Sequence, residues 1–496
     1  MDNKDIQDQA SAFRDQKQKE DPNSLFTKAL PNLEDPIKRL DQAIWKDIKI
    51  KFASRQNNEA IQAIADKLTE ENTFLTIASE NSDTRDQIYL YDNGLYIPNG
   101  REFIRTALEA ELGEYAKTFL ISEIIAKISR KTLEKNKDIF AQTDKNLIAF
   151  NNGIYDLSKG EFTGGFSPQY KFLTKISTDY NAKAKCPKIL NFLSEVAYEE
   201  DIPLIQEWLG FILHRDYLIK KALIIVGERD TGKTTFLNIT DKLIGRRNIS
   251  SVSLQSLSGD RFASATLHSK LLNSFDDLSF QDISATGNFK MLTGNSIISA
   301  QKKFGDVFLF NNHAKLQYAC NKIPSVKDIE DMAYFARWLL LKFDNVQDKP
   351  NRNLLAELTT PEELSGLLNW AIEGLQRLLS NGDFSYSKTP EQVKVLMQMS
   401  CNPIFAFVFD AVKKDPNAWT SKKETYLAYA KYCEANQLSI MTQQKFSRNF
   451  VRYFVAEETE HNKVKGWQGV VINKQYKVSE EDLIKDNSQT GLKIGG

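Results

Sequence analysis

Residues 221–235 read KALIIVGERDTGKTT, and this stretch contains a phosphate-loop motif. The short apolar run at 222–226 predicts a strand that is buried on both faces of a parallel sheet. The next eight residues match G-x-x-x-x-G-K-[ST], and residues 235–243 predict a helix that Gly245 ends. A strand, a glycine-rich loop and a helix in this order form the context in which the motif binds phosphates. The sequence therefore predicts a nucleotide-binding loop within an α/β domain.

We expect this loop to hold ATP together with Mg²⁺. Backbone N–H groups of the loop and the helix N-terminus would face the phosphates. Lys233 would reach the β- and γ-phosphates, and the Thr234 hydroxyl would bind Mg²⁺. The residues expected to surround the nucleotide are Gly227, Glu228, Arg229, Asp230, Thr231, Gly232, Lys233, Thr234 and Thr235.

An acidic pair follows a second candidate strand at 270–275. Asp276 would hold Mg²⁺ through water, and Asp277 would polarise the water that attacks the γ-phosphate. Because Asn273 and Ser274 make this strand less apolar than usual, a surface Asp-Asp turn stays open as an alternative.

Two further polar residues stand out beside apolar stretches. Asn321 ends the stretch at 314–320 just before a proline turn, where it would either cap the strand or orient the attacking water. Arg337 lies within the apolar stretch 334–341 and should seek an anion. That anion is either a local carboxylate or a γ-phosphate bound to the next subunit.

These motifs, in this order, resemble the superfamily 3 helicases, in particular the branch that contains the poxvirus helicase-primase and the phage and plasmid primase-helicases. The resemblance implies a compact AAA+-type ATPase core that assembles as a homo-hexameric ring with ATP bound between subunits. Relatives often carry two arginines where this chain has Ala336-Arg337, and many relatives of the wider fold have Asp-Glu where it has Asp276-Asp277. The resemblance assigns Arg337 to the site of the neighbouring subunit.

The segment 290–304 is similar to the family motif that forms a β-hairpin in the central channel of the ring. By this resemblance, Lys302, Lys303 and Phe304 occupy the tip and grip the backbone of single-stranded DNA. Such phosphate contacts carry little sequence information and are sensitive to salt. The alternative is an ordinary solvated hairpin.

The resemblance extends to both sides of the core, through residues 152–157 and 207–211 before it and residues 426–433, 445–446 and 466–470 after it. It implies an α/β AAA+-type P-loop ATPase core, preceded by an α+β domain and followed by a C-terminal winged helix. The predicted divisions are a polar arm and helical region at 1–70, the α+β domain at 71–215, the core at 216–345, a helical connector at 346–400, the winged helix at 401–478 and a tail at 479–496.

Local patterns add detail to the flanking regions. Residues 88–97 predict a β-hairpin with a tight Asn93-Gly94 turn. Residues 103–135 and 187–213 each read as helical. The C-terminal segment 402–477 carries 12 Lys and Arg against 7 Asp and Glu. This excess suits either duplex DNA binding or a protein-docking module with ordinary surface charge.

Composition restricts the class of protein. The 496 residues contain 65 Lys and Arg and 65 Asp and Glu, so net charge identifies no partner. No apolar run approaches the roughly 18 residues of a membrane span, and residues 1–5 lack the apolar start of a signal peptide. We therefore expect a cytoplasmic protein without a membrane partner. Its four scattered cysteines are expected to be reduced core thiols.

The predicted function is an ATP-dependent replicative DNA helicase of a phage, plasmid or mobile element, moving 3′ to 5′ by family resemblance. No histidine precedes His214 and no cysteine precedes Cys186. The nucleotide-binding histidine and the zinc ribbon of an N-terminal primase are therefore missing, and we expect a separate primase or initiation partner. Three alternatives stay open: a primase-helicase with an unrecognised priming centre, an ATP-regulated DNA-binding initiator with little unwinding activity, and a motor on RNA or on single-stranded DNA during packaging.

Overall fold

A computed structural model describes residues 42–79, 85–136, 138–260, 262–303, 307–346, 351–436 and 438–478. Residues 1–41 of the polar arm and helical region expected at 1–70 lie outside these ranges, as does the tail expected at 479–496. Backbone contacts divide the chain into two compact units. One unit consists of Met1–Ala149 with Gly153–Lys175, and the other of Phe150–Asn152 with Ile176–Gly496.

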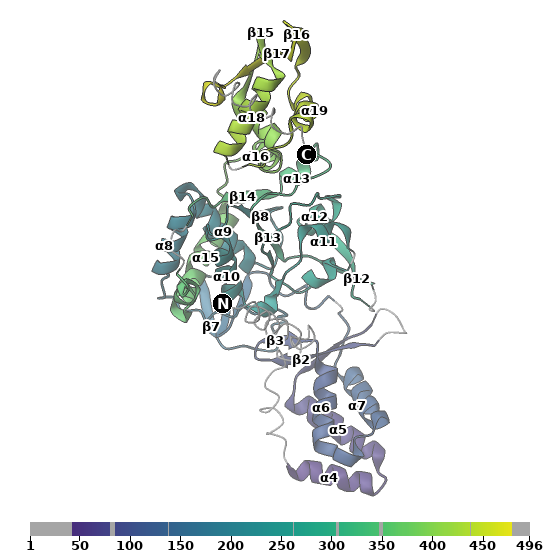
Figure 1. The fold of residues 1–496 in the computed structure, drawn as a ribbon. Helices are drawn as coiled ribbons and strands as arrows, with labels where there is room; N and C mark the ends of the chain where they lie inside the picture. Colours follow the sequence, from purple (N-terminus) through teal and green to yellow (C-terminus); the bar gives the residue numbers. More distant parts are fainter. Residues whose placement is uncertain are drawn as a thin grey trace, which may run out of the picture. The chain divides into compact units, whose positions relative to one another are not determined.

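The first unit combines a group of helices with a four-stranded sheet (Figure 1). Apolar side chains at helical spacing, such as Ile61, Ile64 and Leu68, form its core together with Ile104 and Ile124. The helices are α4 (Gln42–Ala53), α5 (Asn57–Glu71), α6 (Gly100–Leu112) and α7 (Thr118–Lys131), and the strands follow the order β3 (Leu95–Ile97), β2 (Gln87–Asp92), β1 (Phe74–Ile77), β4 (Leu133–Glu134).

The turn predicted at Asn93-Gly94 is confirmed. It joins β2 to β3 as an antiparallel pair, with φ angles of +42° and +90° at the two turn residues. Residues 103–135 are largely helical, as predicted, but they form two helices, because Gly113 takes a φ of +55° and ends α6. A short 3-10 turn, Gly113–Tyr115, then leads to α7. A separate three-stranded sheet has the order β5 (Leu147–Phe150), β6 (Gly153–Asp156), β7 (Glu161–Gly164).

The second unit is built on a five-stranded parallel sheet, as the apolar run at 222–226 predicted. Since all five strands point the same way, their carboxyl ends lie at one edge. The strand that carries the phosphate loop is separated from the strand that carries the acidic pair by one intervening strand. The order is β14 (Trp338–Lys342), β8 (Ala222–Val226), β13 (Lys315–Cys320), β10 (Leu272–Phe275), β9 (Ile249–Ser250).

Helices cover both faces of this sheet (Figure 1). Side chains of one face, including Ile224 and Tyr318, pack into a core with α11 (Leu254–Gly259) and α12 (Gly287–Leu292). On the other face, Gln317 accepts a 2.7 Å hydrogen bond from the indole of Trp208 in α9 (Ile202–Leu213). Alternation along the strands thus divides the apolar residues between two cores, as burial on both faces requires.

Two glycines allow α9 (Ile202–Leu213) to pack closely against α15 (Pro361–Asn381). A Cβ atom at Gly210 would clash with the carbonyl oxygen of Ala371, and one at Gly374 would clash with the backbone of Gln206. Residues 187–213 are largely helical, as predicted. The stretch is divided into α8 (Pro187–Val196), a 3-10 turn and then α9, since Pro203 is tolerated only in the first turn of a helix.

A buried lysine connects this helical layer to the sheet. Lys315, on β13, is fully buried, and its Nζ donates to the carbonyl oxygens of His214, Asp216 and His313 at 2.7, 2.8 and 2.8 Å. Three donors therefore meet three acceptors, and His214 is the C-terminal cap of α9. A cation is favourable at this end of a helix. Burial lowers the pKa of Lys315 to about 7.

The C-terminal part has its own apolar core, which includes Phe407, Tyr429 and Phe446. Its elements follow the order helix, strand, helix, helix, strand, strand: α17 (Pro403–Ala411), β15 (Val412–Ser421), α18 (Lys422–Ala435), α19 (Gln443–Tyr453), β16 (Glu457–His461) and β17 (Val464–Ile472). The three strands form an antiparallel sheet in the order β15-β17-β16. The helices α14 (Leu354–Leu358), α15 and α16 (Pro390–Cys401) precede it.

All four cysteines are free thiols, and Cys186, Cys320 and Cys433 are buried. This agrees with the expected reduced core thiols. In the ranges described, none of the helices combines the length and the apolar character needed to cross a bilayer.

We predict that Gly210→Ala lowers the free energy of unfolding by about 1–3 kcal/mol, the usual cost of overpacking. The added methyl group would force α9 away from α15. The measurement is a denaturant titration followed by circular dichroism. Gly259→Ala is the matched control, because a Cβ there meets nothing within 4 Å. Equal stability of the two variants would contradict the close packing of the helices.

Candidate nucleotide-binding site

The phosphate loop joins β8 to α10 (Lys233–Ile244), and its shape depends on two glycines. Gly232 has a φ of +89°, and a Cβ atom there would approach Val196 Cγ1 to 2.8 Å. At Gly227 a Cβ atom would clash with the carbonyl oxygen of Phe343. Asp230 also has a positive φ, +62°. The backbone thus curls in a way that larger residues at 227 and 232 would prevent.

Lys233 begins α10 and folds back beneath the loop. Its Nζ donates to the carbonyl oxygens of Gly227 at 2.8 Å and Glu228 at 2.6 Å. Burial lowers the pKa of Lys233, and the nearby carboxylate of Asp276 opposes this effect. The ammonium is therefore held at the loop before any phosphate contributes a contact.

Asp276 lies at the carboxyl end of β10, where it meets the loop. Its Oδ2 accepts a 2.7 Å hydrogen bond from the Thr234 hydroxyl. This bond spans the edge of the sheet, because β13 lies between β8 and β10. A hydroxyl and a carboxylate oxygen are the kind of ligands that Mg²⁺ takes. The geometry thus brings together the two residues that the sequence assigned to the metal.

Asp277 and Asn321 lie at the same edge. Asp277 is exposed with a φ of +54°, and its backbone N–H donates to Asp276 Oδ1 at 2.9 Å. Asn321 directly follows β13 and is also exposed. The carbonyl of the residue before it, Cys320, accepts from the N–H of Gly227 at 3.3 Å. Both polar side chains are therefore accessible beside the loop.

Arg337 lies at the opposite edge of the sheet. Its carbonyl accepts from the N–H of Ala222 at 2.7 Å, so it stands at the amino end of β8, one strand length or about 16 Å from the loop. Its guanidinium donates to Thr293 Oγ1 at 3.0 Å and to the carbonyl of Ala333 at 2.5 Å. The structure therefore does not bring Arg337 to the loop of its own chain.

Helix α8 also borders this site, although no motif indicates it. Phe192 and Val196 of α8 pack against Gly232, and the Tyr198 hydroxyl after α8 donates to Asp344 Oδ2 at 2.6 Å. Asp344 follows β14, the strand beside β8. The sequence carries no signal for these residues, since their roles come from tertiary packing alone.

Asp241, on the inner face of α10, is a second residue that the motifs did not indicate. Burial raises the pKa of this carboxyl, and the side chain of Ser274 on β10 opposes the shift by hydrogen bonding. The negative charge of Asp276 adds to the upward shift, so its surroundings favour the protonated form of Asp241.

An antiparallel hairpin is formed by β11 (Ile297–Gln301) and β12 (Val307–Asn311). It begins later in the chain than the predicted segment 290–304, whose first residues belong to α12. Lys302 and Lys303 follow β11 and are exposed. The Lys302 ammonium lies 5.8 Å from the centre of the Phe308 ring. Phe304 lies outside the described residues.

His268 anchors the base of this hairpin. Its ring stands edge-on to Phe308 and Phe310, with centroids 5.1 and 5.4 Å apart. Burial lowers the pKa of His268 to about 4, and the positive charge of Lys302 adds to the shift. The ring is therefore neutral near pH 7.

We predict that the hairpin loses stability as the pH falls from about 6.5 toward 4. The folded pKa lies below that of an exposed histidine, so protons favour the unfolded state. The stabilisation is complete above pH 6.5, and up to about 3 kcal/mol is lost on acidification. Thermal unfolding of the wild type and of His268→Phe should be compared across this range. The prediction would be wrong if the unfolding temperatures of the wild type and of His268→Phe changed by equal amounts between pH 7 and pH 4.

Three family models match separate parts of the chain. Residues 16–214 match a family described as D5 N terminal like, and residues 400–488 match one described as Poxvirus D5 protein-like. The chain is therefore D5-like at both ends. Residues 225–337 match a family of unknown function, DUF5906, whose bounds enclose the phosphate loop, Asp276 and Arg337. The D5 matches confirm the poxvirus D5 part of the predicted resemblance, whereas membership of superfamily 3 stays a prediction.

Similar solved structures include two apo forms of the C-terminal region of NrS-1. One has 12% sequence identity and a TM-score of 0.42, and it covers 83% of this chain and 98% of that chain. The other has 13% identity and a TM-score of 0.42, with 82% and 98% coverage. No curated protein matches the chain.

Proposed function

We propose that the chain is an ATP-dependent replicative DNA helicase of a phage, plasmid or mobile element. The observation that carries this proposal is the 2.7 Å contact between Thr234 of the phosphate loop and Asp276 of a different strand. A chance glycine turn would not be expected to lie beside a carboxylate at the carboxyl edge of a parallel sheet. D5-like sequence on both sides of the site supports a role in replication.

In this proposal, ATP binds with its phosphates against the loop and the N-terminus of α10. Lys233 would exchange its two carbonyl contacts for β- and γ-phosphate oxygens. Thr234 would hold Mg²⁺ directly, and Asp276 would hold it through water. The ion would neutralise charge that develops on the phosphates.

Asp277 and Asn321 would act on the attacking water. Both are exposed beside the loop, which suits a water-polarising carboxylate and an amide that orients the same water. The left-handed backbone of Asp277 supports a functional position, since non-glycine residues seldom take it without a compensating reason.

Arg337 would complete the site of a neighbouring subunit, in a ring that we propose to be a homo-hexamer. Its distance from the loop of its own chain supports action in trans. Its contacts with Thr293 and Ala333 would hold the guanidinium group in place. An arginine is suited to this role because its charge persists and its fork matches phosphate oxygens.

We propose that DNA contacts come from two elements. Lys302 and Lys303 would hold the backbone of single-stranded DNA from the hairpin, together with Phe304. The order of elements at 403–472 supports a winged helix, and α19 presents Lys445, Arg448 and Arg452 as exposed residues at helical spacing. Such a helix suits the groove of duplex DNA.

A DNA-binding initiator that hydrolyses ATP with little unwinding is the second candidate. The basic face of α19 favours it, because that face is separate from the ATP site and would bind an origin duplex. A primase-helicase is also compatible with the D5-like matches.

Replacement of Lys233 by alanine is expected to reduce ATP hydrolysis by about 10²–10³-fold, since one preorganised charge at the transferring phosphate is removed. Hydrolysis should be measured with and without single-stranded DNA. Lys242→Ala is the matched control, because Lys242 is an exposed lysine of the same helix. Forked duplexes with a 3′ or a 5′ tail should then be offered. DNA-stimulated hydrolysis without strand separation would support the initiator instead.

Mixing Lys233→Ala with Arg337→Ala subunits is expected to restore part of the hydrolysis, because some interfaces would then contain one intact loop and one intact arginine. Mixing Lys233→Ala with Asp276→Asn subunits is the control. Both of those residues belong to one site of one chain, so no mixed interface is fully repaired. Equal activity of the two mixtures, in rings shown to be mixed, would contradict action in trans.

A further inference from the structure

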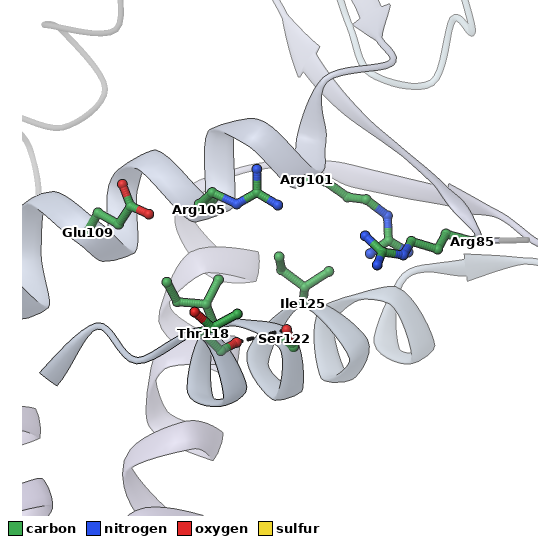
Figure 2. Close-up of a pocket in the computed structure, with 8 residues that line it drawn as sticks. Arg85, Arg101, Arg105, Glu109, Thr118, Ser122 and Ile125 are labelled. Atoms are coloured by element: carbon green, nitrogen blue, oxygen red, sulfur yellow. Dashed lines mark hydrogen bonds between the residues drawn. The ribbon is translucent and has the colours of Figure 1, made fainter. Parts of the chain in front are cut away.

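A cavity of about 310 Å³ lies between α6 and α7 in the first unit, and its lining includes none of the residues proposed to bind ATP or DNA. Figure 2 shows three arginine side chains from one side and two hydroxyl side chains from the other turned toward it. The polar lining residues are Arg85, Arg101, Arg105, Glu109, Thr118 and Ser122, with Ile121 and Ile125 completing the wall.

The three guanidinium groups carry positive charge that nearby carboxylates neutralise only in part. Arg101 Nε donates to the carbonyl oxygen of Asp86 at 3.0 Å. Burial lowers the pKa of Arg101, and the positive charges of Arg85 and Arg105 add to this shift. The arginines are thus close enough to repel one another, and an anion between them would remove that repulsion.

The carboxylates around the cavity are few. Arg105 pairs with Glu102 at 2.9 Å, but both side chains are about half exposed, so this pair is weak. The Asp86 carboxylate accepts hydrogen bonds from Ser79 and Ser129, and its negative charge also attracts Arg101. Glu109 is the single carboxylate among the lining residues. Three arginines therefore face one acid within the lining, while Asp86 and Glu102 offset part of their charge from outside it.

The N-terminus of α7 adds to the positive potential. Thr118 is the first residue of this helix, no side chain caps it, and the first turn contains no acidic residue. Ser122, one turn later, donates its hydroxyl to the carbonyl of Thr118 at 2.8 Å. Free N–H groups at a helix start attract anions.

We propose that this cavity binds a phosphate group of a nucleic-acid strand. A guanidinium group can bind a phosphate through two parallel hydrogen bonds. Arg85 and Arg105 are exposed, which leaves room for a nucleic-acid strand to pass beside them. The choice of a nucleic-acid strand as the source of the phosphate rests on the proposed function. The expectation that the cavity binds an anion rests on its lining residues alone. The site shares no residue with the loop at 227–234 or with the hairpin at 297–311.

The test uses the full chain with Lys302→Gln and Lys303→Gln, so that the hairpin contributes less to binding. Anisotropy of a labelled oligothymidylate, without ATP and across a salt series, is measured with and without Arg85→Gln and Arg105→Gln. We expect affinity to fall about tenfold, and the salt slope to fall by about 0.7 for each phosphate that the protein no longer neutralises. Arg101→Gln should act in the same way.

The control is Arg130→Gln, which removes one positive charge from the exposed face of α7, as each single arginine variant does, and should leave the slope unchanged. An unchanged affinity in the Arg85 and Arg105 variant would overturn the proposal. A second outcome would show that the cavity binds a free phosphate and not a nucleic-acid strand. In that case, inorganic phosphate or a mononucleotide would raise the thermal stability only when these arginines are present, and the arginine substitutions would not change strand binding. The experiment is repeated with Lys233→Ala to separate the two proposals. Strand binding that depends on the arginines should persist in this variant, whether or not the chain hydrolyses ATP.

Discussion

The candidate site depends on one constraint, the parallel register of β8, β13 and β10. Because these strands run in the same direction and end at nearly the same height, the residues that follow them meet at one edge. Thr234, which follows β8, can therefore reach Asp276, which follows β10, although β13 lies between these two strands. Any change that shifted this register would separate the phosphate loop from its acidic partner. The same register places Arg337, which precedes β14, at the far edge.

Close packing of two helices, α9 and α15, supports the sheet on the face that Gln317 occupies. Gly210 and Gly374 let α9 and α15 come together, and Trp208 then reaches Gln317 on the sheet. Lys315 connects the end of α9 to β13 through three carbonyl oxygens. A buried polar group is tolerable only when its partners are supplied, so these contacts specify one packing of the helices on the sheet.

Much of the site could be predicted because its chemistry is local. The loop and Asn321 each follow an apolar run that is buried on both faces, and Asp276 follows a less apolar one. The resemblance indicated a hairpin within 290–304, and the structure has it at 297–311. The helix breaks at Gly113 and before Pro203 were missed, because apolar residues at helical spacing continue through both positions. The contacts of α8 with Gly232 and the meeting of Arg85, Arg101 and Arg105 have no local pattern at all.

The sequence by itself determined the parallel α/β class, the phosphate loop and the order of the chemical groups along the chain. These follow from short-range rules, since strand burial, glycine conformation and motif spacing are properties of neighbouring residues. Only the tertiary structure decided which groups face one another. It joined Thr234 to Asp276, separated Arg337 from its own loop and gathered three arginines around a cavity between α6 and α7. The reason is physical, because such juxtapositions depend on strand order and helix packing between residues far apart in the chain.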